Sequence, residues 1–325
     1  MPGAVAWRVL EAPSPSRLGR SKPARSRAHA GSLALLVLVT VIWGTTFPIV
    51  KTALDTLPAG LIIATRFAVA SLPFLPFLRR ATRATWLAGG RLAVVTFISF
   101  IAQLLGMMTI SSNRAAFITA LNVILVPLFI SVARRKPAWP ALGAALLCLS
   151  GLALMSFEGG GVSVGDLLVF ICALAYAAYI LMLEREAPRH DAFALTGVQL
   201  LAVTLMGGVW SLFSTTPEQL RSLNDQWGVI IYLGLAATAA ATLIQAFAQR
   251  HVSATETSVT YALEPVFASV FAFALLGERL GVRGLAGAAL VVAAMIASQL
   301  GPRSTLPEAP DAGHIMLPEP PEAAA

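Results

Sequence analysis

The chain has 325 residues, of which 57% are hydrophobic and only 12% are charged. A soluble domain carries roughly 25% charged residues, so these charges are too few to cover a water-exposed surface. The net charge of +7 would favour a nucleic-acid partner in a soluble protein. Here the basic residues stand beside apolar runs and have no interleaved aromatic residues, so the composition indicates a membrane protein without a nucleic-acid partner.

The first 30 residues are basic and precede the first apolar run. They hold one acid, Glu11, and no apolar run begins before Leu33, so a short cleavable signal peptide is not expected. The Arg- and Ser-rich composition leaves an organelle transit peptide as an alternative, but we interpret 1–30 as a disordered cytoplasmic tail. Its basic residues are Arg8, Arg17, Arg20, Lys22, Arg25 and Arg27.

Ten apolar runs follow, each about long enough to cross the roughly 30 Å hydrocarbon core of a bilayer as a helix. They cover 32–50, 56–78, 92–113, 115–133, 137–157, 167–183, 192–217, 226–249, 257–277 and 284–302. Helices are required because unpaired backbone groups are too costly in lipid, and the runs lack the alternation of barrel strands. The sequence therefore predicts an all-α polytopic membrane protein with ten transmembrane helices in a lipid bilayer.

The connecting loops are short, and their basic residues predict the orientation in the membrane. Arg114 alone separates the third run from the fourth, so consecutive helices are expected to be antiparallel neighbours. With the N-terminus cytoplasmic, the inner segments carry 17 Lys and Arg residues and the outer loops carry 5. Because Lys and Arg favour the cytoplasmic side, both termini are predicted inside. The Pro-rich, acidic segment 302–325 is predicted to be a disordered cytoplasmic tail.

The chain also contains an internal similarity. A shift of 144 positions places 114–151 on 258–295 without a gap, and Gly143-Ala144-Ala145-Leu146 then meets Gly287-Ala288-Ala289-Leu290. Five apolar runs precede Gly165 and five follow it, so the second set starts from the opposite side of the membrane. Two inverted halves are typical of transporters with a site near the bilayer midplane. The two predicted five-helix repeats cover 31–157 and 164–301.

Short motifs follow one another along the chain in a characteristic order. They are Trp43-Gly44-Thr45-Thr46-Phe47-Pro48, Arg66-Phe67, Gly106-Met107-Met108-Thr109 through Val126-Pro127, Gly165-Asp166, Leu263-Glu264-Pro265-Val266-Phe267 and Gly277-Glu278-Arg279-Leu280. In order and spacing they resemble the EamA-type transporters of the drug/metabolite transporter (DMT) superfamily, over about 32–300. Tyr176-Ala177 departs mildly, since that family often has Trp-Ala there. The resemblance implies a ten-helix inverted-repeat carrier that commonly exports amino acids, other metabolites or drugs.

Two charged residues, Arg66 and Glu264, lie within the predicted spans. Each costs roughly 2.5–3.5 kcal/mol at the bilayer centre, so both are expected to face the bundle interior. Pro265 follows Glu264 and should interrupt its helix, which suits a gate or an ion site. Glu264 is a candidate for binding a cationic group or relaying a proton, and Arg66 for binding a substrate carboxylate. The alternative is structural, with the two residues paired to each other or to the backbone.

Further polar and aromatic residues within the spans are candidates for lining a substrate cavity. Buried polar groups need partners, and a solute or water can supply them. The alternative is hydrogen bonding between helices, which membrane bundles also use. These residues are Trp43, Gln103, Asn122, Tyr176, Tyr179, Gln199, Gln245 and Tyr261.

No pattern in the sequence points to a cofactor, a metal or an enzymatic site. Cys148 and Cys172 lie in apolar runs and are interpreted as small core residues, and the four histidines lack ligand spacing. Gly161-Val162-Ser163-Val164-Gly165 matches a hydrolase nucleophile motif, but a predicted loop and a membrane span surround it, with no triad histidine nearby. We therefore expect no enzymatic activity, no cofactor and no ATP hydrolysis.

The resulting prediction is a secondary transporter of small metabolites in the cell membrane, working by alternating access around a central cavity. Export is implied by the resemblance alone, as is a bracing or homodimerising role for the fifth and tenth spans. The alternatives are an intramembrane transferase-type enzyme and a non-transporting scaffold. Substrate, direction, oligomeric state and coupling ion, with proton coupling one option, stay open at this point.

Overall fold

Helices account for all the regular secondary structure that the computed structural model describes, in residues 22–133 and 161–299 with isolated positions between them. Side chains are described in 28–133 and 161–294, again with isolated positions between them. Within these limits, eight helical segments are long and apolar enough to cross a membrane. They are Ala28–Ala53, Ala59–Arg80, Arg83–Met107, Ser112–Ala133, Val164–Arg189, Ala192–Ser214, Pro217–Ala248 and Ala254–Leu276. The protein is therefore a polytopic all-α membrane protein, as predicted.

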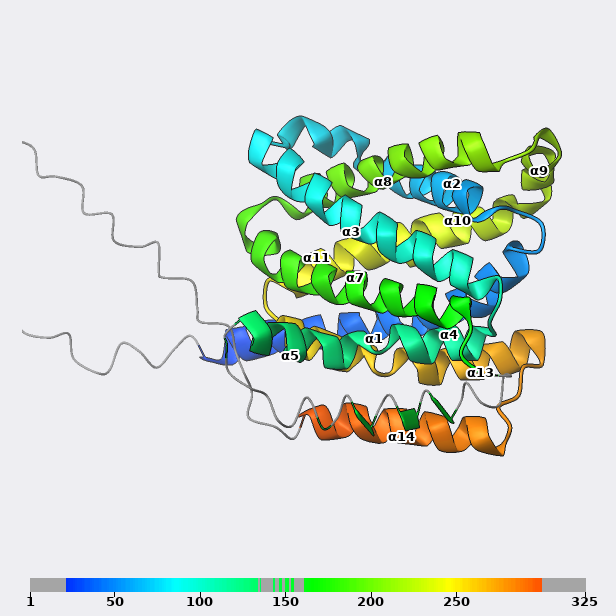
Figure 1. Ribbon diagram of the computed structural model, residues 1–325. Coiled ribbons are helices and arrows are strands. Elements are labelled where there is room, and N and C mark those ends of the chain that lie inside the picture. The colour runs from blue at the N-terminus through cyan, green and yellow to red at the C-terminus, as the bar shows by residue number, and fades with distance from the viewer. Residues whose placement is uncertain are drawn as a thin grey trace, which may run out of the picture.

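The helices run side by side along one bundle axis (Figure 1). In chain order the α-helices are α1 Lys22–Ala53, α2 Ala59–Ser71, α3 Arg83–Met107, α4 Ser112–Thr119, α5 Asn122–Ala133, α7 Val164–Glu186, α8 Ala192–Ser214, α9 Pro217–Ser222, α10 Trp227–Gly234, α11 Ala241–Ala248, α12 Ala254–Tyr261, α13 Glu264–Leu276 and α14 Val282–Gln299. Short 3₁₀ segments extend α2 (Leu72–Arg80), α7 (Ala187–Arg189) and α9 (Leu223–Gln226), and a π-helical turn, Leu235–Ala240, joins α10 to α11.

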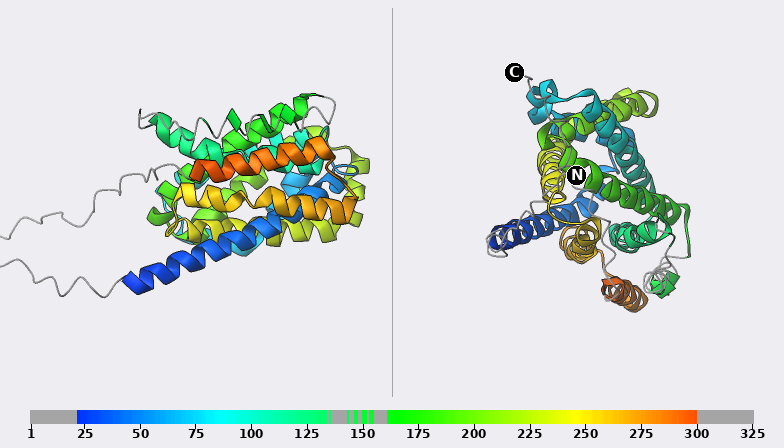
Figure 2. Two further views of the ribbon diagram at one scale, coloured as in Figure 1. Left: turned by 90° about the horizontal axis from the view of Figure 1, so that it is seen from below. Right: turned by 90° about the vertical axis from the view of Figure 1, so that its left-hand side faces the viewer.

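Two predicted spans lie at or beyond the limits of this description. The fifth, 137–157, falls mostly outside the described residues, and so does Cys148. The tenth corresponds to α14, whose described apolar part, Val282–Ala294, lies outside the main bundle in Figure 2. Most of both predicted tails is also outside the description, except that α1 begins at Lys22 and thus enters the predicted segment 1–30.

Charged residues mark helix boundaries less well than the sequence suggested. The third span was expected from residue 92, but α3 begins at Arg83, where the Thr82 hydroxyl caps its first turn. Arg91 lies on the exposed side of this helix. A long basic side chain can reach water from within the last turns of a membrane helix, so a single charge need not end a span.

Arg114 was also expected to be the link between two spans, and this is wrong. The link is the turn before Ser111, whose hydroxyl accepts from the Arg114 backbone N–H and caps α4. Arg114 lies in the first turn of α4 and is 7% exposed, paired with Asp166 of α7. Its charge is tolerated there because a carboxylate neutralises it.

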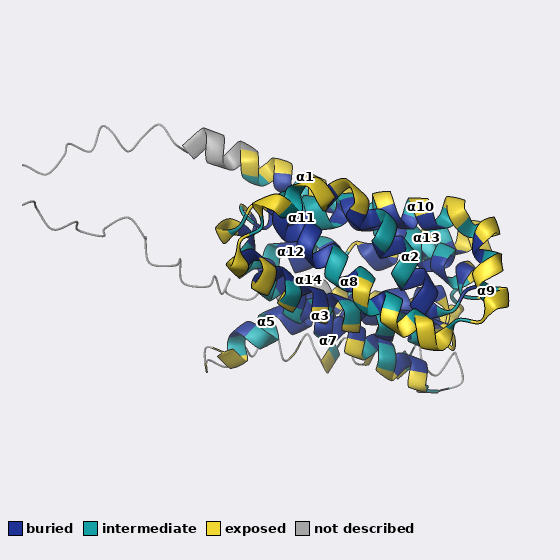
Figure 3. Cartoon of the chain, turned by 90° about the horizontal axis from the view of Figure 1, so that it is seen from above, coloured by how far each residue is buried: buried dark blue, intermediate teal, exposed yellow. Residues whose placement is uncertain are grey.

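The main helix contacts join the first half of the chain to the second. The most extensive are α3 with α7, α2 with α8 and α1 with α13. Gly44 allows one of them, because a Cβ atom there would stand 2.6 Å from Cβ of Phe267 in α13. Buried residues therefore lie between the halves, while exposed residues gather on the outer surface and at the helix ends (Figure 3).

Two spans are broken at matching points. α4 ends at Thr119 and α5 begins at Asn122, while α12 ends at Tyr261 and α13 begins at Glu264. These boundaries are 142 positions apart, so the ungapped shift of 144 is wrong in this stretch. Thr119-Ala120-Leu121 corresponds instead to Tyr261-Ala262-Leu263. Identities among Ala-rich helices did not fix the register, whereas the backbone breaks do.

Candidate functional site: a polar pocket between the halves

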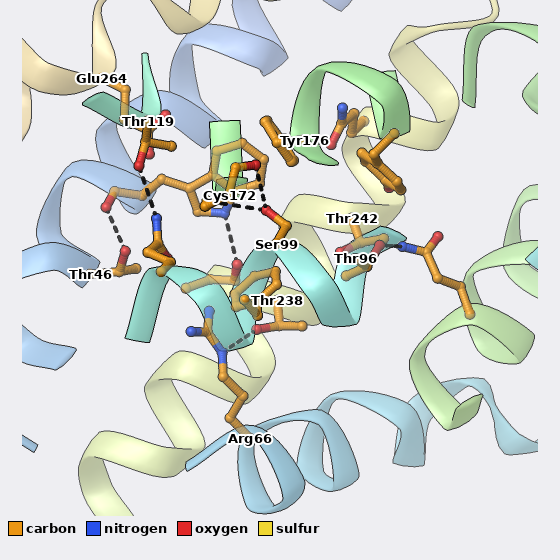
Figure 4. Close-up of a pocket in the computed structure, with 17 residues that line it drawn as sticks. Thr46, Arg66, Thr96, Ser99, Thr119, Cys172, Tyr176, Thr238, Thr242 and Glu264 are labelled. Atoms are coloured by element: carbon orange, nitrogen blue, oxygen red, sulfur yellow. Dashed lines mark hydrogen bonds between the residues drawn. The ribbon is translucent and has the colours of Figure 1, made fainter. Parts of the chain in front are cut away.

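A pocket lies inside the bundle, where helices of both halves meet (Figure 4). Its empty volume is about 630 Å³, including the space at its mouth. Its walls come from α1, α2, α3 and α4 of the first half, and from α7, α8, α11, α13 and the π-helical turn of the second. The lining residues are Trp43, Thr46, Arg66, Thr96, Ser99, Phe100, Gln103, Thr119, Cys172, Tyr176, Tyr179, Gln199, Ala237, Thr238, Thr242, Gln245 and Glu264.

Aromatic rings form a cluster on one side of the pocket. The Trp43 ring centroid lies 5.7 Å from that of Tyr176 and 5.0 Å from that of Tyr261. Tyr176 also stacks on Tyr179, with centroids 5.6 Å apart. Such packing holds the rings in fixed positions, and those of Trp43, Tyr176 and Tyr179 line the pocket, where an aromatic ring can attract a cationic group.

The π-helical turn positions two side chains from the first half. The wider turn exposes backbone groups, and the carbonyl of Ala237 accepts from Trp43 Nε1 at 2.8 Å. One residue on, the Thr238 hydroxyl accepts from Arg66 Nε at 2.8 Å and donates to the Leu233 carbonyl. π-helical turns of this kind occur frequently at functional sites.

Arg66 is 2% exposed and extends into the pocket from α2. Its guanidinium carbon lies 4.8 Å from the ring centroid of Phe100, so part of its charge faces an aromatic ring. The hydrogen bond to Thr238 uses one of its five N–H groups. The expected structural pairing with Glu264 is not found, since no ion pair joins the two among the residues that the structure describes.

Glu264 is 5% exposed and opens α13, immediately after the break in that span. Pro265 occupies the first turn of α13, so the predicted interruption beside Glu264 is confirmed. Proline suits the first turn of a helix, because the N–H groups of that turn have no partner within the helix and proline has no N–H. The carboxylate makes no hydrogen bond or ion pair with any residue that the structure describes.

Most of the remaining polar lining is held by hydrogen bonds between helices. Gln103 donates to the Thr119 hydroxyl, Gln199 to that of Thr96, and Tyr176 donates to Gln245 at 3.2 Å. These contacts agree with the structural alternative for the polar residues, but each pair also presents polar atoms to the cavity. The pocket is therefore a preformed, polar-lined space in an otherwise apolar bundle.

The structure brings together most of the residues singled out from the sequence. Around the pocket lie Trp43, Arg66, Gln103, Tyr176, Tyr179, Gln199, Gln245 and Glu264. Asn122 and Tyr261 do not line it: Asn122 is fully buried beside the break before α5, and Tyr261 packs against the ring of Trp43.

Sequence reasoning missed the small polar and apolar lining residues. These are Thr46, Thr96, Ser99, Phe100, Thr119, Ala237, Thr238 and Thr242, together with Cys172, which was interpreted as a core residue. Threonine, serine and alanine are common throughout membrane helices, so their identity carried no signal. A shift of 142 positions aligns Thr119 with Tyr261, which was a cavity candidate from the sequence. With that shift, Thr119 would have become a candidate as well.

An all-helical membrane bundle with a polar pocket between its halves is the class of architecture expected of a transporter. The chain matches the EamA-like transporter family over residues 31–157 and again over 163–298. It therefore belongs to this family, as the resemblance indicated.

Individual relatives agree with this assignment. An "Uncharacterized transporter" of Archaeoglobus fulgidus is 30% identical over 265 residues, which cover 80% of this chain and 83% of the relative. A "Probable biotin transporter" of Pseudomonas aeruginosa is 29% identical, over 63% of this chain and 75% of that protein. A solved structure at 16% identity superimposes with a TM-score of 0.62, over 83% of this chain and 97% of its own, and shares the fold.

Proposed function

We propose that this protein is a secondary transporter of small solutes that works by alternating access around the pocket. In this proposal ten spans form two inverted five-helix repeats, 31–157 and 164–301, and the first four spans of each repeat enclose the cavity. Both termini lie in the cytoplasm, the protein resides in the cell membrane, and transport runs outward. Family membership and the transporter names of the relatives support the general class.

The observation that carries the proposal is the position of the two helix breaks. The break before Asn122 and the break before Glu264 correspond within the two halves, and Thr119 and Glu264, which flank them, both line the pocket. Interrupted helices at equivalent places in two inverted repeats are the best pointer to a transporter's binding site. A channel, an intramembrane transferase or a scaffold has no comparable need for this arrangement.

The topology has its own test. Accessibility tags at residue 160 and at residue 325 are expected on opposite faces of the membrane, because five spans separate the first from the N-terminus and five more separate it from the C-terminus. Finding both tags on the same face would contradict the two inverted repeats.

Solute counterflow in proteoliposomes tests the transport function. Purified protein is reconstituted, the vesicles are loaded with unlabelled solute, and uptake of a trace of the labelled solute is followed for single amino acids, biotin, carboxylates and amines. A carrier exchanges solute across a sealed bilayer, whereas an enzyme or a scaffold does not. The proposal fails if no solute exchanges faster than in protein-free vesicles.

Glu264 is the proposed cation- or proton-binding group of the cavity. Its titratable neighbours are Tyr176 and Tyr261 of the aromatic cluster, with Cys172 across the pocket. Glu264→Gln keeps the size of the side chain but removes the charge, so it is expected to abolish any acceleration of transport by an imposed proton gradient. Full transport with an unchanged response to that gradient would leave Glu264 with a structural role only.

A further inference from the structure

The pocket holds two ionisable side chains of opposite sign that form no ion pair with each other. Arg66 and Glu264 both line it, and each is more than nine-tenths buried. Figure 4 shows them at opposite ends of the ring of lining residues, Arg66 entering from α2 and Glu264 from α13. A charge at this depth is costly even on a lenient insertion scale. An arrangement that keeps them apart therefore calls for a partner from outside the chain.

The cationic end has donors to spare. Nε of Arg66 is bound to Thr238, and this bond fixes the plane of the guanidinium. The two terminal nitrogens donate to no residue in the described part of the chain, and Figure 4 shows them directed toward the interior of the pocket. Paired terminal N–H groups match the two oxygens of a carboxylate, which they bind in a bidentate manner.

The anionic end combines a carboxylate with aromatic faces. Glu264 lines the same pocket as Trp43 and Tyr176, whose rings form a cluster with that of Tyr261 at centroid distances of 5.0 to 6.2 Å. A cationic group gains from an aromatic face as well as from the carboxylate, and both attractions strengthen where water is excluded. This end therefore suits an ammonium or a substituted amine.

We propose that the pocket takes amphoteric solutes, with the acidic group at Arg66 and the cationic group between Glu264 and the aromatic cluster. This inference rests on the proposed transport function and names the chemistry of its substrate. A simple amine leaves Arg66 without a counter-charge, a simple acid leaves Glu264 without one, and an uncharged solute leaves both. Only a solute with both charges offsets the two burial costs in a single binding event.

Matched triads of probes test the inference in the same counterflow assay. One triad is L-phenylalanine, phenethylamine and 3-phenylpropionate, and the other is L-leucine, 3-methylbutylamine and 4-methylpentanoate. Each triad keeps one apolar side chain and removes one charged group at a time. Because a hydrogen bond to a charged group contributes about 1.5–3 kcal/mol, we expect the amphoteric member of at least one triad to exchange about tenfold or more faster.

Two variants assign the ends of the pocket. Arg66→Met is expected to remove the preference for the amino acid over the amine. Glu264→Gln is expected to remove the preference for the amino acid over the acid. The controls are Arg91→Met on the exposed side of α3 and Glu218→Gln in α9, both outside the pocket and both expected to leave all rates unchanged. If Arg66→Met fails to fold, the wild-type triads and Glu264→Gln still decide.

The outcomes separate this inference from the function on which it rests. Exchange of acids, amines or uncharged solutes at rates equal to or above those of the amino acids would overturn the inference and leave transport standing. An equal loss for all members of a triad in both variants would also overturn it. No exchange of any solute would overturn the transport function and the inference together.

Discussion

The two broken spans differ in how their first helical segments are anchored. α4 and α12 have the same length and the same relation to the break, and they begin at opposite ends of the bundle (Figures 1 and 3). The third helical position after the cap is Arg114 in α4 and Glu256 in α12, and each contacts the start of another span. Arg114 pairs with Asp166 of α7, and Glu256 faces His29 of α1 at 3.4 Å.

The environments of these two pairs are not alike. The side chains of Arg114 and Asp166 are 9% and 10% exposed, and Arg114 also donates to the Gly161 carbonyl. His29 and Glu256 are each 38% exposed, and Glu256 is already engaged in capping α12 through Ser253. The contact is thus buried and made by an arginine at one end, and more exposed and made by a histidine at the other. The comparison predicts that the end at α4 is the more firmly closed of the two.

The largest effect is expected for the buried pair. Arg114→Met leaves the Asp166 carboxylate without its counter-charge, and removing one partner of a buried ion pair costs about 3–5 kcal/mol. The free energy of unfolding in detergent should fall by that amount, measured against Arg91→Met as the control. If the double variant Arg114→Met with Asp166→Asn is no more stable than Arg114→Met alone, the broken ion pair is not the cause of the lost stability.

Glu278 strengthens the same end of the molecule. From the loop after α13 its carboxylate accepts from the backbone N–H groups of Ser112 and Asn113 and from the Asn113 side chain, at 3.0 to 3.2 Å. An anionic cap at a helix N-terminus contributes about 0.5–2 kcal/mol, so Glu278→Ala should lower the unfolding free energy by about that much. Glu218→Ala is the control, and an equal effect of both variants would count against the cap.

Asn122 and Glu264 occupy the same position after the two breaks but should behave differently. Asn122 donates to the Thr119 carbonyl at 2.9 Å and does not line the pocket. Asn122→Ala should therefore cost about 1 kcal/mol of stability without changing which solutes exchange. Glu264→Gln should show the reverse pattern, with altered exchange and nearly unchanged stability. Counterflow and thermal unfolding of the same preparations give both quantities, and a changed solute preference in Asn122→Ala would contradict the distinction.

The smallest effect is expected for the half-exposed pair. His29→Ala removes one partner of an ion pair of a kind that contributes about 0–1 kcal/mol, and this contribution weakens as salt is added. The measurement is the unfolding free energy at low and high ionic strength. A loss as large as that of Arg114→Met would contradict the comparison between the two ends.

The sequence was sufficient for the features that depend on composition along the chain. Long apolar runs predicted the eight spans found in the described residues, and the rarity of charge within them pointed to Arg66 and Glu264, which both line the pocket. Pro265 indicated the break before α13, since proline prevents the preceding helix from continuing. The break before α5 carries no such marker in its two turn residues, Ala120 and Leu121, and was missed.

Partners were less predictable than residues. Arg66 and Glu264 were expected to pair as an alternative to binding solute, yet Arg66 donates to Thr238 and Glu264 stays apart. Arg114 was assigned to a loop because a charge in an apolar sequence resembles a boundary. Its buried ion pair depends on Asp166, a residue 52 positions away, which no local pattern connects to it.

By itself, the sequence determined that this chain spans lipid, the approximate course of its apolar helices, and two charges deep within them, because hydrocarbon imposes helices and penalises charge wherever they occur in the fold. Only the tertiary structure decided what those charges face. The contacts of α3 with α7, α2 with α8 and α1 with α13 bring the halves together and leave the pocket between them. Such contacts depend on the shapes of neighbouring helix surfaces, so they cannot be obtained from hydropathy alone.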